Sequence, residues 1–208
     1  MPGDQLPSQR ELAEALGVGM STLREALQSL QSMGIVDMRH GEGTFVTSQP
    51  NDMYDRLVTL SLAIGETDLE MLLESREILE TGFAFYAANR ATDKQIDALF
   101  DILETEHKII NQGRKKEVHE LDMAFHHLIA EMTQNKFLMQ IDDTLFNALD
   151  ELLLALPQTF EGWQLHYEVA VGIRDRDPFK ASEAMRTLIE ASAARYLPFL
   201  ANQQKITE

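Results

Sequence analysis

The fold is decided near the start of the chain by the stretch Leu6-Pro7-Ser8-Gln9-Arg10-Glu11-Leu12-Ala13-Glu14-Ala15-Leu16-Gly17-Val18, continued by Ser21-Thr22-Leu23-Arg24-Glu25-Ala26-Leu27. Ser8 and Glu11 have the spacing of a capping box, in which each side chain satisfies a backbone N–H at a helix start. Gly17 predicts the end of that helix, because glycine adopts the left-handed C-cap conformation without strain. The stretch therefore predicts two short helices joined by a tight turn, a helix-turn-helix.

The second helix has an apolar and a polar face. Apolar residues recur at helical spacing and predict a stripe facing a core, made of Leu23, Ala26, Leu27, Leu30 and Met33. The polar face carries Ser21, Arg24, Glu25 and Gln28. Arginine and glutamine can make bidentate contacts with base edges in a major groove, so this face indicates a helix that reads DNA.

A hairpin is predicted directly afterwards. Two short β-prone runs, 35–39 and 44–47, are separated by the turn residues His40-Gly41-Glu42-Gly43. The order helix, turn, helix, hairpin is that of a winged helix.

Residues 2–46 closely resemble the DNA-binding head of the GntR superfamily of bacterial transcription regulators. The matching blocks are Pro-Gly-Asp at 2–4, Leu-Pro-Ser-x-Arg-Glu-Leu-Ala at 6–13, Leu-Arg-Glu-Ala-Leu at 23–27 and Gly-x-Gly-Thr-Phe-Val at 41–46. The resemblance implies DNA contacts by Arg10, Arg24 and His40 with Gly41, to which the polar face adds the candidates Ser21, Thr22 and Gln28.

The head departs from its family in two respects. Relatives usually carry Ser-Arg or Thr-Arg where this chain has Gly19-Met20, so we expect a different sequence preference or affinity at that step. Residues 1–48 also hold three arginines against six acidic side chains, a charge of −3 within a chain of −16, whereas DNA-binding heads are normally basic. For such an acidic head to bind DNA, we expect one of three features: a local cationic patch on the recognition face, the doubling of that patch by dimerisation, or cations in a preceding segment. Such heads begin with one more helix, so we expect this sequence to be an N-terminally shortened form.

The chain of 208 residues fits two modest domains. We place a winged helix-turn-helix at 1–48, a linker at 49–52 and an all-helical effector-binding and dimerisation domain at 53–208. Because the chain has no cysteine, it can form neither a disulfide nor a thiolate metal site. This composition is consistent with the cytoplasm. The apolar run 152–156 is far shorter than the roughly 20 residues that span a membrane, and the polar start is unlike a signal peptide.

The second domain has a helical pattern throughout. Thr67 with Glu70 and Thr92 with Gln95 have capping-box spacing, while residues 111–113 and 175–178 predict helix ends. We expect helices near 53–64, 67–90, 92–112, 115–133, 136–156, 160–174 and 178–200. The predicted fold is thus mainly α, with an antiparallel bundle of about six to seven helices that is large enough for an internal cavity.

One group of polar residues in this domain has metal-ligand spacing. His119, Asp122 and His126 are at i, i+3 and i+7 and share one face of a helix. His127 points about 100° away and is a less suitable partner. A solvated or capped polar stripe is the more common explanation of such spacing, and His166 by itself indicates only a hydrogen-bonded histidine.

Residues 72–196 look like the effector domain of FadR-type GntR regulators, through Arg76-x-x-Leu79-Glu80 and Asp122-x-x-Phe125-His126-x-x-Ile129-Ala130. In many members an aspartate and three histidines hold a divalent metal, and a small carboxylate effector completes its shell. Asp122, His126 and His166 match three of those positions, Leu188 occupies the fourth, and Arg76 becomes a candidate for the effector pocket. Two outcomes stay open: a zinc-like ion held by three residues, or a metal-free, more hydrophobic pocket. His119 is a less suitable substitute for the fourth ligand.

The sequence as a whole predicts a ligand-responsive, homodimeric transcription regulator, expected to be a repressor, that binds a palindromic double-stranded operator and a carboxylate-like effector. Two other functions are compatible with parts of the sequence. Met20 and the acidic head are compatible with a sensor or adaptor that no longer binds DNA. Asp122 with two histidines is compatible with a metal-dependent hydrolase, but no nucleophile elbow or second carboxylate accompanies them, so we expect no enzymatic activity.

Overall fold

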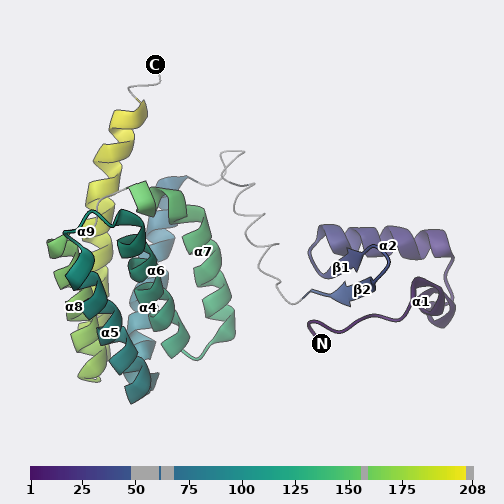
Figure 1. Cartoon of the computed structure of the whole chain (residues 1–208), viewed down its shortest axis with the longest axis horizontal. Helices are drawn as coiled ribbons and strands as arrows, with labels where there is room; N and C mark the ends of the chain where they lie inside the picture. The colour runs from purple at the N-terminus through teal and green to yellow at the C-terminus, as the bar shows by residue number, and fades with distance from the viewer. Residues whose placement is uncertain (48–60, 62–67, 156–158, 205–208) are drawn as a thin grey trace. The chain divides into compact units, whose positions relative to one another are not determined.

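The computed structural model describes residues 1–47, 61, 68–155 and 159–204, and the chain divides into two units, Met1–Leu60 and Ser61–Glu208. Figure 1 shows helices and a small sheet in the first unit and helices alone in the second. The predicted linker at 49–52 and, apart from residue 61, the predicted helix near 53–64 lie outside the described residues.

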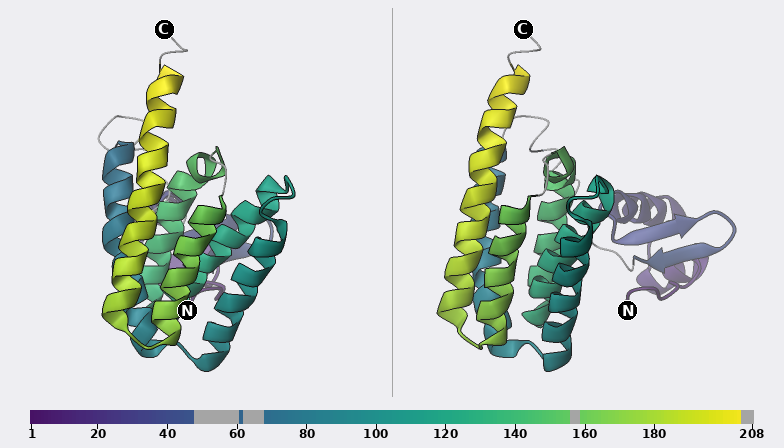
Figure 2. Two further views of the ribbon diagram at one scale, coloured as in Figure 1. Left: turned by 90° about the vertical axis from the view of Figure 1, so that its left-hand side faces the viewer. Right: turned by 60° about the vertical axis from the view of Figure 1, so that its left-hand side comes forward.

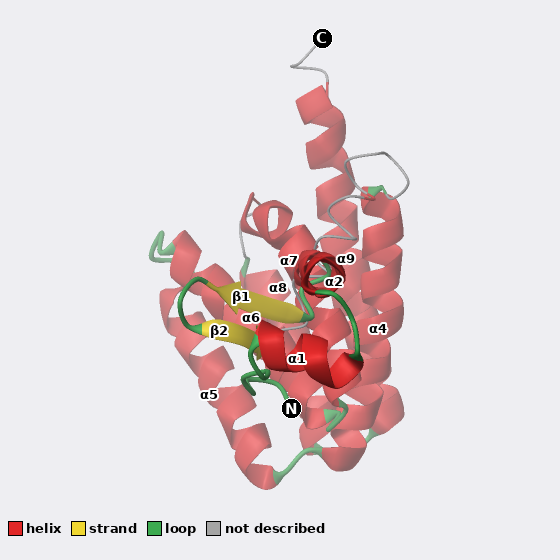
Figure 3. Ribbon diagram, turned by 90° about the vertical axis from the view of Figure 1, so that its right-hand side faces the viewer, coloured by secondary structure: helices red, strands yellow, loops and turns green. Residues whose placement is uncertain are grey.

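The first unit is a winged helix-turn-helix, as predicted. It contains α1 (Gln9–Leu16), α2 (Met20–Ser32), β1 (Val36–Arg39) and β2 (Gly43–Val46). The capping box of Ser8 opens α1, and Gly17 ends it in the left-handed conformation. The two strands pair antiparallel as a hairpin beside the helices (Figure 3).

The hairpin is held by the segment that precedes α1. Leu6 N donates to the carbonyl oxygen of Thr44 at 2.7 Å, and Gly3 N donates to that of Val46 at 2.9 Å. This segment therefore covers the outer edge of β2 and fixes the hairpin relative to α1.

The core of the first unit is narrower than the sequence predicts. Leu23 and Leu27 of α2 are buried against Ala13, whereas Ala26 and Met33 are exposed. The predicted stripe is wrong at these two positions, because within the described residues α1 and the hairpin cover only the Leu23 side of α2.

The second unit is a bundle of helices, as predicted. Its described helices are α4 (Leu69–Arg90), α5 (Asp93–Ile109), α6 (Lys115–Met132), α7 (Lys136–Ala155), α8 (Phe160–Arg174) and α9 (Pro178–Gln204). Thr92 caps α5 with Gln95 as expected. Thr67 of the predicted capping box lies outside the described residues, and the Asp68 carboxylate caps α4 by accepting from Met71 N.

Two sets of helices form the bundle. The long α9 packs along α4 and α8, and α6 contacts α4, α5 and α7 (Figure 2). Apolar side chains from α4, α5, α6, α8 and α9 form one buried cluster. A Cβ atom on Gly172 of α8 would lie 2.7 Å from the backbone of Ala181, so α8 and α9 approach more closely there than any side chain permits. Among the described helices, none is long and apolar enough to cross a membrane.

Candidate functional site

The predicted DNA contacts all lie on the surface of the first unit. His40 and Gly41 form the exposed hairpin tip, where Gly41 has a φ of +80°. The other candidates are exposed on the two helices and comprise Arg10 on α1 and Ser21, Thr22, Arg24 and Gln28 on α2.

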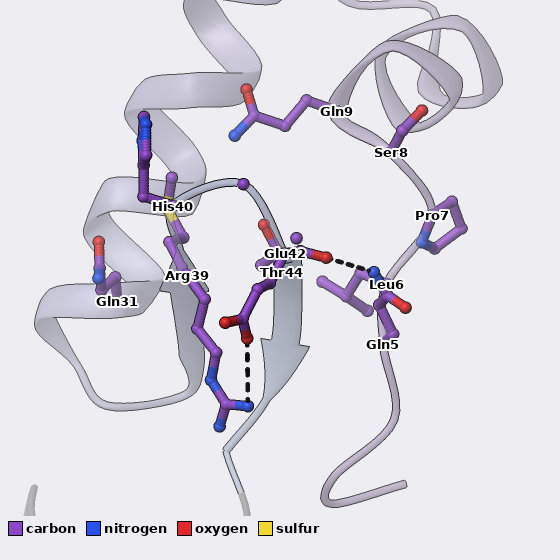
Figure 4. Close-up of a pocket in the computed structure, with 13 residues that line it drawn as sticks. Gln5, Leu6, Pro7, Ser8, Gln9, Gln31, Arg39, His40, Glu42 and Thr44 are labelled. Carbon is purple, nitrogen blue, oxygen red and sulfur yellow. Dashed lines mark hydrogen bonds and ion pairs between the residues drawn. The ribbon is translucent and has the colours of Figure 1, made fainter.

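A groove of about 590 Å³ runs between the hairpin tip and the start of α1 (Figure 4). His40 and Gly41 line it on one side, and Ser8 and Gln9 line it on the other. Sequence reasoning missed Gln9, which carries no motif signal beyond its place between Ser8 and Arg10.

The three arginines in the described part of the first unit differ in their partners. Arg39 Nε donates to Asp37 Oδ2 at 2.8 Å, and its guanidinium lies over the Phe45 ring at 4.7 Å. Arg24 Nε donates instead to the neutral Gln9 Oε1 at 3.3 Å. Within the part of the chain that the structure describes, neither Arg10 nor Arg24 pairs with a carboxylate. Their charges thus stay available to phosphates, although the unit is acidic.

In the second unit, α6 and α8 bring together Asp122, His126 and His166. One ligand atom from each lies within 4.8 Å of the others, and all three residues are buried. His166 Nε2 is 2.9 Å from Asp122 Oδ1 and 3.4 Å from His126 Nε2. Both Nε2 atoms therefore face a common centre.

The orientation of both imidazoles is set by their other ring nitrogens. His166 Nδ1 lies 2.9 Å from the carbonyl oxygen of Gly162, which can only accept, so this nitrogen donates. His126 Nδ1 contacts the Oε2 atom of Glu80. Metal-bound histidines usually bind a carbonyl or carboxylate in this way through the ring nitrogen that does not face the ion.

A buried ion pair on α4 adjoins the histidines. Arg76 Nε donates to Glu80 Oε1 at 2.5 Å, and Arg76 Nη2 lies 3.1 Å from His126 Nε2. A guanidinium has no acceptor, so His126 Nε2 must accept. Burial acts to raise the pKa of Glu80, but the charge of Arg76 and the hydrogen bonds from Arg76 and His126 outweigh it and lower this pKa to about 2.

Protonation follows from the same contacts. Burial opposes a charge on Asp122 and on His166, but their mutual hydrogen bond lowers the pKa of Asp122 well below its usual range and raises that of His166. Burial lowers the pKa of His126. Asp122 and His166 therefore form an ion pair, and His126 is neutral beside it.

Two further groups that sequence reasoning missed lie within electrostatic range. Burial raises the pKa of Glu106 on α5 to about 7, and its carboxylate has no hydrogen-bond partner among the described residues. Burial also raises the pKa of Tyr196 on α9 to about 12, although the charge of Arg76 opposes the shift. Glu106 could have been noticed, because it continues the apolar stripe of α5 with a carboxylate.

The remaining histidines of α6 contact α7. His119 Nε2 is 2.8 Å from Asp150 Oδ1 on α7, and His119 is not part of the group that Asp122, His126 and His166 form. Leu188 is buried in the apolar cluster of the bundle and offers no ligand atom.

Family models match a stretch of each of the two units. Residues 71–191 match the FCD domain, and residues 1–46 match the model of bacterial regulatory proteins of the gntR family. The chain belongs to the GntR family. The resemblance inferred from its motifs is confirmed, including the assignment to the FadR-type group that carries an FCD domain.

Individual GntR relatives are regulators of transcription. The chain is 33% identical over 171 residues to "HTH-type transcriptional regulator LutR" of Bacillus subtilis (strain 168). This alignment covers 82% of this chain and 75% of LutR. The chain is 31% identical over 209 residues to "HTH-type transcriptional repressor NanR" of Klebsiella aerogenes, covering 93% and 77%. The solved structure "Streptococcus agalactiae GntR" has a TM-score of 0.66 at 25% identity and covers 92% of this chain and 90% of its own. This GntR protein is a DNA-binding transcription regulator, and the named relatives are regulators of transcription as well.

Proposed function

We propose that this GntR regulator is a homodimeric repressor whose FCD domain binds a small organic acid through Arg76 and a divalent metal at Asp122, His126 and His166. The observation that carries the proposal is the set of three donor atoms within 4.8 Å, beside a buried guanidinium. NanR, a relative named as a repressor, supports the direction of regulation.

The donor set fits a zinc-like ion. An aspartate oxygen and two imidazole nitrogens are ordinary ligands for such metals, and the contacts of Glu80 and Gly162 orient the imidazoles as those of metal sites are oriented. With Leu188 at the fourth position, the protein supplies three ligands. A bound ion would supply a positive charge with open positions that a carboxylate and water can fill.

Arg76 gives the effector its chemical class. A buried guanidinium can bind a carboxylate through two parallel hydrogen bonds, which are stronger than neutral ones. The Tyr196 hydroxyl, within electrostatic range of Arg76, adds a neutral polar group. A small carboxylic acid satisfies both the guanidinium and a metal, whereas a purely apolar ligand would leave the guanidinium desolvated.

In the head, Arg10, Ser21, Thr22, Arg24, Gln28, His40 and Gly41 are the proposed operator contacts. A two-fold dimer doubles the arginines that lack carboxylate partners and reads a palindromic operator, because protein symmetry is mirrored in half-site spacing. The effector changes operator affinity only to the extent that it binds one arrangement of the two heads better than another.

The metal component is tested by zinc titration and elemental analysis of the wild type, Asp122→Ala and Leu188→His. Leu188→His should raise zinc affinity at least tenfold, because it adds a fourth ligand to the three in place. Asp122→Ala should abolish zinc binding at this site and any carboxylate binding that depends on it. Leu188→Met is the matched control, since it conserves volume without adding a ligand nitrogen.

The alternative gives a different pattern. If the pocket works without metal, Leu188→His buries an unsatisfied imidazole and lowers the melting temperature, with no gain of zinc. If the wild type and Leu188→His bind no more zinc per chain than Asp122→Ala does, the metal site is excluded. An organic pocket around Arg76 then remains. Thermal-shift screening of small carboxylates then tests that pocket, with Arg76→Gln expected to abolish the shift.

A further inference from the structure

We propose a second divalent-cation site, between α6 and α7, formed by His127, Asp142 and Asp143. One ligand atom from each residue lies within 4.8 Å of the others. None of the three belongs to the Asp122 site, so this proposal does not depend on the proposed effector site.

The distances from the imidazole to both carboxylates are close to those that a tetrahedral ion requires. His127 Nδ1 is 3.0 Å from Asp142 Oδ2 and 3.5 Å from Asp143 Oδ1. Ligands bound at 2.0–2.2 Å with tetrahedral angles lie about 3.4 Å from one another. A zinc-like ion could therefore bind without a large movement of either helix.

Asp142 provides an independent indication of a ligand. It is 1% exposed, and its Oδ1 atom has no hydrogen-bond partner among the described residues. A buried carboxylate oxygen without a partner is costly, because its hydration is lost and not replaced.

The site is open to solvent on one side. The three residues line a surface pocket of about 300 Å³ together with Glu131, one helical turn after His127 on α6. The side chains of His127 and Asp143 are 39% and 45% exposed. An ion can therefore enter from solvent, and water or Glu131 can complete its coordination.

The chemical class of the ion follows from the donors. One imidazole and two carboxylates favour zinc and similar transition metals over calcium and magnesium, which prefer oxygen ligands alone. Bound there, the ion would link α6 to α7 through ligands on both helices.

The same two helices contain a natural control. His119 and Asp150 form a comparable contact, with Nε2 2.8 Å from Oδ1. Among the described residues, no third ligand joins that pair to make a metal-binding group. Comparing the two pairs separates a metal site from an ordinary histidine–aspartate bridge.

Isothermal titration of the full chain with zinc tests the proposal. Asp143→Asn should weaken zinc binding at one site at least tenfold and reduce the rise in melting temperature that zinc causes. Its half-exposed side chain makes this variant safe for the fold. Asp150→Asn, the matched control, should bind zinc as the wild type does.

A second arm separates this site from the effector site. Asp122→Ala should keep one zinc ion, and the double variant Asp122→Ala with Asp143→Asn should lose it. This result holds whether or not the Asp122 site binds metal. Zinc binding that is unchanged in both Asp143→Asn and His127→Gln, or absent from folded Asp122→Ala, would overturn the second site.

Discussion

Two histidines that are neighbours in sequence lie in different environments. His126 is buried and faces Arg76 and His166, whereas His127 faces α7 and is partly exposed. Consecutive residues on a helix point about 100° apart, which accounts for the difference. The Phe146 ring lies 5.4 Å from one imidazole and 5.2 Å from the other, so a single apolar side chain packs against both clusters.

Glu106 should make stability depend on pH. Burial raises its folded pKa to about 7 from a usual value of 4.5, so between these values the folded chain keeps a proton that the unfolded chain has lost. Stability should therefore fall as pH rises through this window, by on the order of 3 kcal/mol in total. Glu106→Gln removes the ionisation, and its unfolding free energy relative to wild type should increase from pH 4.5 to 7.

Chemical denaturation at several pH values, with a chelator present, measures this effect. Glu104→Gln is the control, because that carboxylate is exposed on the same helix and its pKa is lowered by a hydrogen bond with Lys108. A difference between Glu106→Gln and wild type that stays constant across the window would contradict the assignment.

At the scale of elements, the contact between α8 and α9 depends on a glycine, Gly172, which has no side chain. Gly172→Ala should destabilise the bundle by about 1–3 kcal/mol, because its Cβ would collide with the backbone of Ala181. Gly82→Ala on α4 is the matched control: its Cβ meets nothing within 4 Å, so it should stabilise by about 0.5–1 kcal/mol. Equal melting temperatures for the two variants would show that α8 and α9 can separate without loss.

The elements themselves were largely predictable because their signals are local. Ser8 with Glu11, Gly17, and Thr92 with Gln95 act within a few residues of the helix ends they determine. The exposure of Met33 was not predictable, because it depends on which other elements cover α2. Local spacing alone could not identify the described start of α4 at Leu69 either.

The buried site was predictable only in part. Asp122, His126 and His166 came from a family resemblance, since spacing along α6 selected His119 just as well. Glu80, Glu106 and Tyr196 come from three other helices, and only tertiary packing brings them into range. Leu188 was predictable as a position, but its effect on metal binding depends on the surrounding shell.

At the scale of the whole molecule, operator binding should depend on the arginines of the head and on how many heads bind. Arg24→Ala should weaken operator binding by about 1–3 kcal/mol for each bidentate base contact that is lost. If Arg10 neutralises a phosphate, Arg10→Ala should flatten the plot of log affinity against log salt by about 0.9 for a single head and about 1.8 for a dimer. Fluorescence anisotropy across salt concentrations distinguishes these values, and an unchanged slope would exclude a phosphate contact by Arg10.

The histidine–aspartate bridges between α6 and α7 also restrict how the chain can change in length. His119 and His127 are eight positions apart on α6, and so are Asp142 and Asp150 on α7. An inserted or deleted residue between the two bridges rotates one histidine about 100° from its partner, so both bridges cannot survive. Changes of length in the turn at 133–135 leave both spacings intact. Insertions and deletions in this part of the protein should therefore be confined to that turn.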